Sequence, residues 1–406
     1  MKRNLLLIII LLVANAAGNV WAQNVLSATE WEHSLAEVVS NNTQLQVARK
    51  EMKAQQLANG TELRLADPEA EVAYFAGSPK GVPGRTNVSL TQSLDWSVLL
   101  GRRKQLAKVE NRQAELVYQQ QLQQVVAETD RTLTQLVYYN QLCAELQQRK
   151  VLADELSVLY QKKFEQGDIH QMELNKIRLN AAVSLSELTR AQAERAQMLQ
   201  QLQQLNGGKS IEMNDTLYPA ANQPLPALSA FTAAVQSMPS VMLAKSGYEQ
   251  QQAALRLAKS EALPALTVGF QGEYVKENNY SGLSVGFTLP LWGNGRRKVK
   301  QAEAELMVQQ LNINDATLQQ TALVEQLYSQ AVALQNTANE LANNLQHNSN
   351  AKLLRRSLEL GQISLLDYLL EISFYYTART AQLEANRDAQ LAVSALRSSV
   401  CVISNP

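Results

Sequence analysis

Residues 266–274 read LTVGFQGEY, and residues 283–289 read LSVGFTL. In both segments most alternate residues are large and apolar, while the residues between them are small or polar. A period of two predicts extended strands with one apolar face and one polar face. Strands of nine or ten residues with this pattern are typical of strands that cross a membrane. We therefore expect the following side chains to face lipid: Val268, Phe270, Val285 and Phe287.

The first half of the chain contains a similar pair of segments. Residues 87–94 alternate in the same way, with Val88, Leu90 and Leu94 on the apolar side, whereas the strand expected near residues 72–76 alternates poorly. Only a closed barrel satisfies every backbone group of a sheet in lipid, and single-chain barrels begin at about eight strands. Because one chain offers only four strands, the barrel must be shared between chains. Two chains would give eight strands and three would give twelve.

The sequence is internally duplicated. FEQGDI at 164–169 recurs as LELGQI at 358–363, and GRRK at 101–104 recurs at 295–298. The offset is the same for both pairs, since 361 − 167 and 295 − 101 are both 194. Two matches at one offset predict a tandem repeat. We place the repeats at residues 23–215 and 216–406.

Long helices dominate each predicted repeat. Residues 102–166 and 296–360 contain neither Pro nor Gly, so each run of 65 residues predicts a helix about 98 Å long. Heptad-like apolar stripes on these helices, for example from Leu122 to Cys143, require partner helices. Helices are also expected before the strands, over residues 29–65 and 229–261, and after the turns, over residues 172–205 and 366–397.

The first 22 residues have the features of a secretory signal peptide. Lys2 and Arg3 precede an apolar run, and the third-last and last positions before the expected cleavage site hold Val20 and Ala22, which are small or apolar. We expect cleavage after Ala22 and export of the mature chain. No later stretch approaches the about 20 apolar residues that a membrane-spanning helix needs.

Composition argues against several other classes of protein. The chain has 37 basic and 37 acidic residues, and this balance argues against a basic nucleic-acid-binding protein. Two cysteines, at 143 and 401, and three scattered histidines give no pattern for a disulfide framework or a zinc site. No group of residues has the arrangement of a catalytic site, so we expect no enzyme activity and no cofactor.

Two cationic clusters begin the long helices, at residues 102–104 and 296–298. Positive charge is unfavourable at the positive end of a helix dipole unless another group attracts it. A position at the lipid headgroups and a solvated charged collar both remain open. Trp96 and Trp292, just beyond the second strand of each pair, suit either an interfacial aromatic belt or a buried core.

These features together resemble the TolC family of outer-membrane efflux channels, over essentially the whole mature chain. The resemblance depends on the duplication, on the two GRRK helix starts and on two turns, Gly167-Asp168-Ile169 followed by Glu173 and Gly361-Gln362-Ile363-Ser364 followed by Asp367. It implies a mainly α fold of long helical hairpins that form a trimeric α-helical barrel, with four strands per chain in a shared 12-stranded β-barrel. It also implies an outer-membrane location that extends into the periplasm of a Gram-negative cell.

The resemblance further implies partners and site residues. The expected partners are two further copies of the chain, outer-membrane lipid, a periplasmic adaptor protein and an inner-membrane pump of the RND class, with drugs, metal ions or other small molecules as the exported substrate. The turns would dock the adaptor, and acidic side chains would form an entrance constriction, although Leu370 stands where the family has a second aspartate. Solvated charges on a helix surface are the alternative for these carboxylates, and an exported coiled-coil scaffold is the alternative for the whole protein. The expected docking residues are Gly167, Asp168, Ile169, Gly361, Gln362, Ile363 and Ser364, and the expected constriction residues are Asp367, Glu371 and Glu173.

Overall fold

The computed structural model describes residues 30–61, 63–219, 224–276, 278–288, 295–347 and 351–400. The expected signal peptide, residues 1–22, and Trp292 lie outside these ranges. The described residues form two compact units. The first unit draws on the segments Met1–Val47, Gln121–Met238 and Gln320–Pro406, and the second consists of Ala48–Gln120 and Pro239–Gln319.

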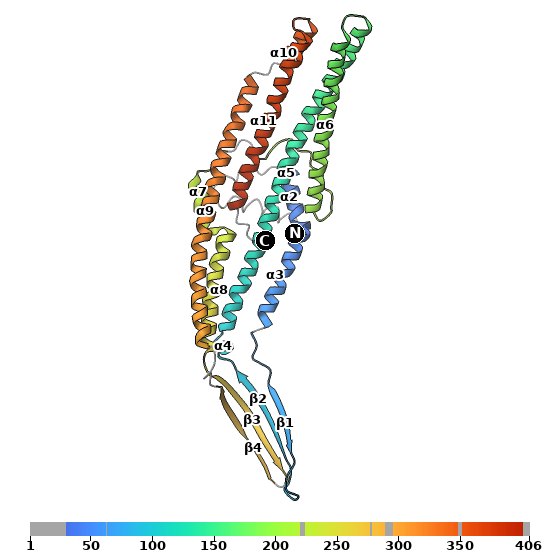
Figure 1. Ribbon diagram of the computed structural model, residues 1–406. Coiled ribbons are helices and arrows are strands. Elements are labelled where there is room, and N and C mark those ends of the chain that lie inside the picture. The colour runs from blue at the N-terminus through green and yellow to red at the C-terminus, as the bar shows by residue number, and fades with distance from the viewer. Residues whose placement is uncertain are drawn as a thin grey trace. The chain divides into compact units, whose positions relative to one another are not determined.

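Most of the described chain is helical (Figure 1). The longest helix, α5, covers Arg102–Glu165, which agrees to within one residue with the segment that lacks Pro and Gly. In the second half the corresponding segment is described as α9 (Gly295–His347) and α10 (Ala351–Glu359). The helices that return from the two turns are α6 (Gln171–Leu205) and α11 (Leu365–Val400).

The expectation of single helices before the strands was wrong in both halves. Residues 29–65 contain α2 (Glu30–Asn41) and α3 (Thr43–Thr61), which meet at Asn42. The Asn42 side chain accepts a hydrogen bond from Leu45 N at 3.0 Å, as an N-cap residue does, and donates one to Leu205 O at 2.8 Å. Residues 229–261 contain α7 (Leu228–Ala234), the short 3-10 helix η1 (Val235–Ser237) and α8 (Pro239–Glu261). Pro239 opens α8 because proline fits the first position of a helix but cannot continue one.

Four antiparallel strands form one sheet in the second unit. Their order is β1 (Glu69–Phe75), β2 (Arg85–Leu94), β3 (Ala265–Val275) and β4 (Asn278–Thr288), and they lie side by side in Figure 1. The pairing of β2 with β3 joins the strands of the first half of the chain to those of the second. The strand expected near residues 72–76 is β1, which begins earlier, at Glu69. Acidic and apolar residues alternate from Glu69 to Val72, whereas the remaining residues alternate poorly, as expected.

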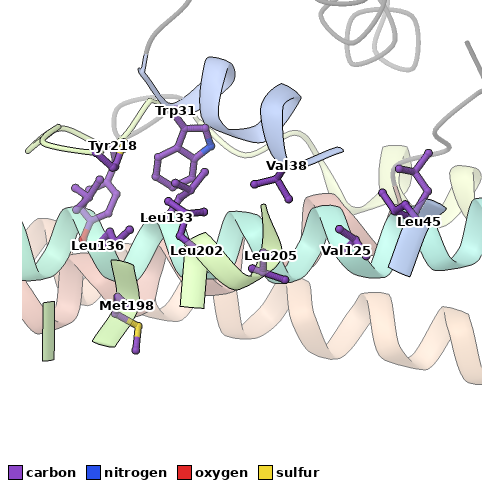
Figure 2. Close-up of a cluster of buried hydrophobic side chains, with 13 residues drawn as sticks. Trp31, Val38, Leu45, Val125, Leu133, Leu136, Met198, Leu202, Leu205 and Tyr218 are labelled. Atoms are coloured by element: carbon purple, nitrogen blue, oxygen red, sulfur yellow. The ribbon is translucent and has the colours of Figure 1, made fainter. Parts of the chain in front are cut away.

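The core of the first unit packs α2, α5 and α6 together. Figure 2 shows Trp31 and Val38 of α2 directed toward α5, with Leu133 and with Leu202 of α6 beside them. Trp31 Nε1 also donates a hydrogen bond to Asp130 Oδ1 at 3.1 Å. The predicted stripe on α5 is confirmed, since its members are buried or partly buried. The fully or nearly buried members are Leu122, Thr129, Leu133, Leu136 and Asn140.

Cys143 lies partly buried at the end of this stripe and packs against a small cluster that contains Leu146 and Leu188. Burial raises the pKa of the Cys143 thiol above its ordinary value. A thiol in this environment forms little reactive thiolate, in agreement with its interpretation as a small hydrophobic side chain. Among the described helices, none combines the length and the apolar character that crossing a membrane would require.

Candidate functional site: a two-faced sheet and two hairpin turns

The register of the sheet places most of the large apolar residues of the four strands on one face. Phe270 in β3 lies opposite Leu90 in β2 and Leu283 in β4, and Val268 lies opposite Val285. Because side chains alternate across a strand, each of these pairs extends into a row on the same face. The large apolar residues of this face are Val72, Tyr74, Val88, Leu90, Leu94, Leu266, Val268, Phe270, Tyr274, Leu283, Val285 and Phe287.

This apolar face is largely uncovered within the chain. Leu283 is 89% exposed, Phe287 is 68% exposed and Val285 is 62% exposed. Soluble proteins rarely leave a contiguous apolar surface of this kind in water. The face therefore requires an apolar environment or a partner, and the four residues predicted to face lipid all belong to it.

The opposite face of the sheet is mainly polar, with Phe75, Val275 and Tyr280 at the end of the sheet that holds Arg85. It carries serine, threonine, asparagine and glutamine side chains together with Glu69, Glu71, Arg85 and Glu273. Arg85 Nη1 lies 3.2 Å from Glu273 Oε1, and its guanidinium also covers the ring of Phe75. A sheet with one apolar and one hydrated face matches a barrel wall between lipid and a water-filled lumen.

Both edges of the sheet have hydrogen-bonding groups available. In the part of the chain that the structure describes, β1 pairs only with β2 and β4 pairs only with β3. Long unpaired edge strands have a strong tendency to pair with strands of another chain. The sheet thus has the properties of a barrel segment rather than of a complete barrel.

A polar cluster lies at the end of the sheet where β2 is followed by the short helix α4 (Trp96–Leu99) and then by α5. Arg103 Nη2 lies 2.9 Å from Asp95 Oδ2 and 3.8 Å from Glu261 Oε1, and Arg103 Nε donates to Ser97 Oγ at 2.8 Å. Trp96 Nε1 donates to Pro264 O at 2.7 Å. These carboxylates explain why a cation is stable at the start of α5. The sequence does not show the contribution of Glu261, because that residue is distant along the chain.

The two turns have the same backbone structure. Gly167 and Gly361 have φ values of 79° and 70°, which L side chains rarely adopt. In the first turn Asp168 N donates to Lys163 O at 2.9 Å, and in the second Gln362 N donates to Ser357 O at 2.9 Å. Both turns are Schellman motifs, in which glycine ends one helix and directs the chain into the next. The expectation of a left-handed glycine at each turn is confirmed.

The carboxylates expected at the entrance occupy equivalent positions at the starts of α6 and α11. Asp367 Oδ2 accepts hydrogen bonds from Ser364 Oγ at 2.6 Å and Ser364 N at 3.4 Å, while Ser364 Oγ accepts one from Asp367 N at 3.1 Å. Glu173 Oε2 accepts a bond from His170 N at 3.4 Å. These are capping interactions, which an acidic residue at the third helical position forms with the helix start. Glu371 lies exposed one turn further along α11.

Apolar side chains lie directly behind the turns. Leu365 of α11 shares a cluster with Tyr160 of α5 and Ile177 of α6, and Ile169 packs against this cluster. Burial raises the pKa of the Tyr160 and Tyr368 hydroxyls above their ordinary values. Of the residues expected to dock a partner, Ile169 and Ile363 are half-buried, whereas Asp168 and Gln362 are exposed. Among the described residues, no three His, Cys, Asp or Glu side chains are grouped so as to hold a metal ion.

Comparisons with known proteins identify the fold. No protein-family model matches the sequence, and no curated protein sequence matches it. Solved structures do match. A membrane protein from Pseudomonas aeruginosa superposes with a TM-score of 0.76 at 17% identity over 92% of this chain and 91% of its own. The CmeC outer membrane channel of Campylobacter jejuni gives 0.71 at 16% identity over 95% and 91%, and the MtrE outer membrane channel of Neisseria gonorrhoeae, in its open state, gives 0.72 at 15% identity over 93% and 94%.

The chain therefore has the fold of outer-membrane channels, nearly from end to end. The predicted fold class, long α-helical hairpins with four strands that contribute to a barrel, is confirmed. The resemblance to TolC-like channels that the sequence indicated is confirmed at the level of the fold.

Proposed function

We propose that the protein is the outer-membrane channel of a tripartite efflux system, a passive exit duct for substrates driven by an inner-membrane pump. The observation that carries the proposal is the exposed apolar face of the four-stranded sheet, in a chain with the fold of outer-membrane channels. Lipid is the environment that such a face fits. The neighbours are channels and not enzymes, which supports transport rather than catalysis.

The proposed location is the outer membrane, with the helices extending into the periplasm of a Gram-negative cell. β3 and β4 have 11 residues each, or about 37 Å when extended. At a tilt of about 40° they would span about 28 Å, close to the apolar band of about 25 Å in outer-membrane barrels. The strands are therefore long enough to cross the membrane.

The proposed assembly is a homotrimer with a 12-stranded barrel. Four strands with two unpaired edges support a barrel made of several chains. Dimers with eight strands would also close a barrel, and the resemblance to the TolC family favours three chains.

The proposed partners are a periplasmic adaptor and an inner-membrane pump of the RND class. The turns that begin at Gly167 and Gly361 would dock the adaptor, because both are exposed, and they have the same backbone motif. Asp367, Glu371 and Glu173 would line the entrance. Their positions near the turns support this role, although Asp367 and Glu173 also cap helices.

Cell fractionation tests the proposal directly. The mature protein should be recovered with the outer membrane as a trimer that resists detergent, and a deletion strain should become susceptible to compounds that the intact strain exports. Recovery as a soluble periplasmic monomer would instead support the coiled-coil scaffold. A susceptibility panel that includes metal salts would identify the class of substrate.

A further inference from the structure

The start of α9 carries a cluster of four cations. They are Arg296, Arg297, Lys298 and Lys300, and all four residues are exposed. The sequence contains no acidic residue from position 278 to position 302. In the described part of the chain, none of the four side chains forms an ion pair. We call these four residues the α9 cationic cluster.

The nearest acidic residues along α9 are bound to other groups. Glu303 Oε1 lies 3.5 Å from Lys259 Nζ of α8. Glu305 accepts hydrogen bonds from Gln251 Nε2 at 2.6 Å and from Gln301 Nε2 at 2.8 Å. The charge of the α9 cationic cluster is therefore not neutralised by the acidic residues of its own helix.

The same GRRK motif has different surroundings at the start of α5. There Arg103 Nη2 lies 2.9 Å from Asp95 Oδ2 and 3.8 Å from Glu261 Oε1. Among the described residues, no such carboxylate pair accompanies the start of α9. Cations at the positive end of a helix dipole are unfavourable unless an anion lies near them. An anion from outside the chain would supply the missing stabilisation.

The α9 cationic cluster lies at one end of the sheet, in the same compact unit. A Cβ added to Gly295 would be 3.2 Å from the Cβ of Ala262, which is three residues before the first residue of β3. Trp96 Nε1 donates to Pro264 O in the same segment at 2.7 Å. The cluster is thus close to the place where the apolar face of the sheet ends.

Apolar side chains are exposed at this end of the sheet. Phe287, in the last row of the apolar face, is 68% exposed, and Leu263 is 47% exposed. An exposed apolar surface bordered by unpaired cations matches the boundary between the acyl chains and the headgroups of a bilayer. The long lysine and arginine side chains can extend from an apolar surface to a polar layer.

Three of the four cations share one side of α9. At about 100° per residue, Arg296, Arg297 and Lys300 fall within an arc of about 100°. Ala302, on the opposite side of the helix, is buried. The three cations therefore point away from the side of α9 that packs within the chain.

We propose that the α9 cationic cluster binds the phosphate groups of anionic phospholipids, in the leaflet nearest to the helices. This inference depends on the proposed function, because it takes the apolar face of the sheet to lie in lipid. The guanidinium groups of Arg296 and Arg297 suit bidentate binding of phosphate oxygens. Each lysine or arginine close to an anionic membrane surface strengthens binding by about fivefold at moderate salt.

Fluorescence quenching by brominated lipids tests the inference, with the purified mature protein in phosphatidylcholine vesicles. Trp96 is the reporter, because it contacts the segment beside the cluster. Brominated phosphatidylglycerol should bind at least about fivefold more strongly than brominated phosphatidylcholine at low salt. This ratio should fall toward one in about 0.5 M NaCl, because salt screens exposed charges.

Two triple variants identify the residues responsible. Arg296→Gln, Arg297→Gln and Lys300→Gln together should bring the ratio close to one. The matched control removes three exposed cations from α3 of the same unit and should leave the ratio unchanged. Its substitutions are Arg49→Gln, Lys50→Gln and Lys53→Gln.

Each other outcome would overturn the inference. Quenching by neither lipid would refute the membrane location and the proposed function with it, whereas equal binding of the two lipids would refute the inference alone. An equal loss in both triple variants would show only a general effect of charge. A ratio lowered by about 10 mM inorganic phosphate at constant ionic strength would indicate a site for free phosphate. An unchanged ratio with weaker trimers in the first triple variant would show that the cluster binds a second copy of the chain.

Discussion

Replacing Phe270 with arginine tests the assignment of the two faces of the sheet. Phe270 is the sixth of the 11 residues of β3 and lies opposite Leu283, the sixth residue of β4. It is therefore at the centre of the apolar face along the strand direction. Gln271 is its neighbour in β3 and points to the polar face, which makes Gln271→Arg a matched control.

The expected cost follows from depth in the membrane. An arginine on the lipid face at the midplane destabilises an outer-membrane barrel by about 2–4 kcal/mol, and one near the interface by about 0–1 kcal/mol. In a trimer the substitution occurs three times, so Phe270→Arg should cost about 6–12 kcal/mol per trimer. Phe287 is four residues from the centre of β4, or about 10 Å along the membrane normal, so Phe287→Arg should be much milder.

Thermal dissociation of trimers on detergent gels, with guanidinium titration in lipid vesicles, would measure these effects. The expected order of destabilisation is Phe270→Arg, then Phe287→Arg, then Gln271→Arg. Equal losses for Phe270→Arg and Gln271→Arg would refute the assignment, because they would show that the two faces meet the same environment.

Three further outcomes are expected. Gly361→Trp should abolish efflux, measured by drug susceptibility, while fractionation still recovers trimers in the outer membrane. No atom lies near the added Cβ, so inside the chain only the positive φ opposes the substitution, and the bulky side chain would block the proposed docking of the adaptor. Normal export would exclude this turn as a docking site. Asp367→Asn should reduce cation selectivity and block by trivalent cations in single-channel recordings, and unchanged values would exclude an acidic gate there. Burial raises the pKa of the Asp130 carboxyl above its ordinary value of 3.8, so the contribution of this group to stability is full below that pH and decreases as the pH rises from 3.8 to the higher pKa of the folded state. Asp130→Asn should weaken the dependence of the free energy of unfolding on pH, measured by chemical unfolding at a series of pH values. An unaltered dependence would show that Asp130 does not titrate with a raised pKa in the folded chain.

The strands and long helices were predictable from the sequence because their signals are local. A period of two placed Val268, Phe270, Val285 and Phe287 on one face, and the observed register confirms this shared face. The absence of Pro and Gly from 102–166 gave the bounds of α5 to within one residue. In each case the signal is repeated along the whole segment, as alternation in the strands and as the absence of helix breakers in α5, so the prediction does not depend on any tertiary contact.

The interruptions and the polar junctions were not predictable in the same way. Asn42, between α2 and α3, accepts from Leu45 N as an N-cap residue does and donates to Leu205 O, 163 residues away. A sequence pattern does not reveal the second contact. Arg103 is stable at the start of α5 because Asp95 binds it, and Glu261, which is distant along the chain, lies 3.8 Å from it. The sequence does not distinguish Arg149 from the other charged residues of the long helix, whereas the structure shows that it is buried and contacts α11. The roles of such residues depend on tertiary contacts, which cannot be recognised from the pattern of a single sequence.

The carboxylates near the turns illustrate how one residue can satisfy two requirements. Asp367 and Glu173 both occur six residues after a turn glycine, where helix capping alone favours an acidic side chain. Their spacing is thus expected whether or not they face a channel. Glu371 lies in the second turn of α11, beyond the reach of capping, so Glu371→Gln would change only the charge near the entrance. If the entrance is an acidic ring, Glu371→Gln should lower cation selectivity without altering trimer stability, and a variant with native selectivity would remove Glu371 from the constriction.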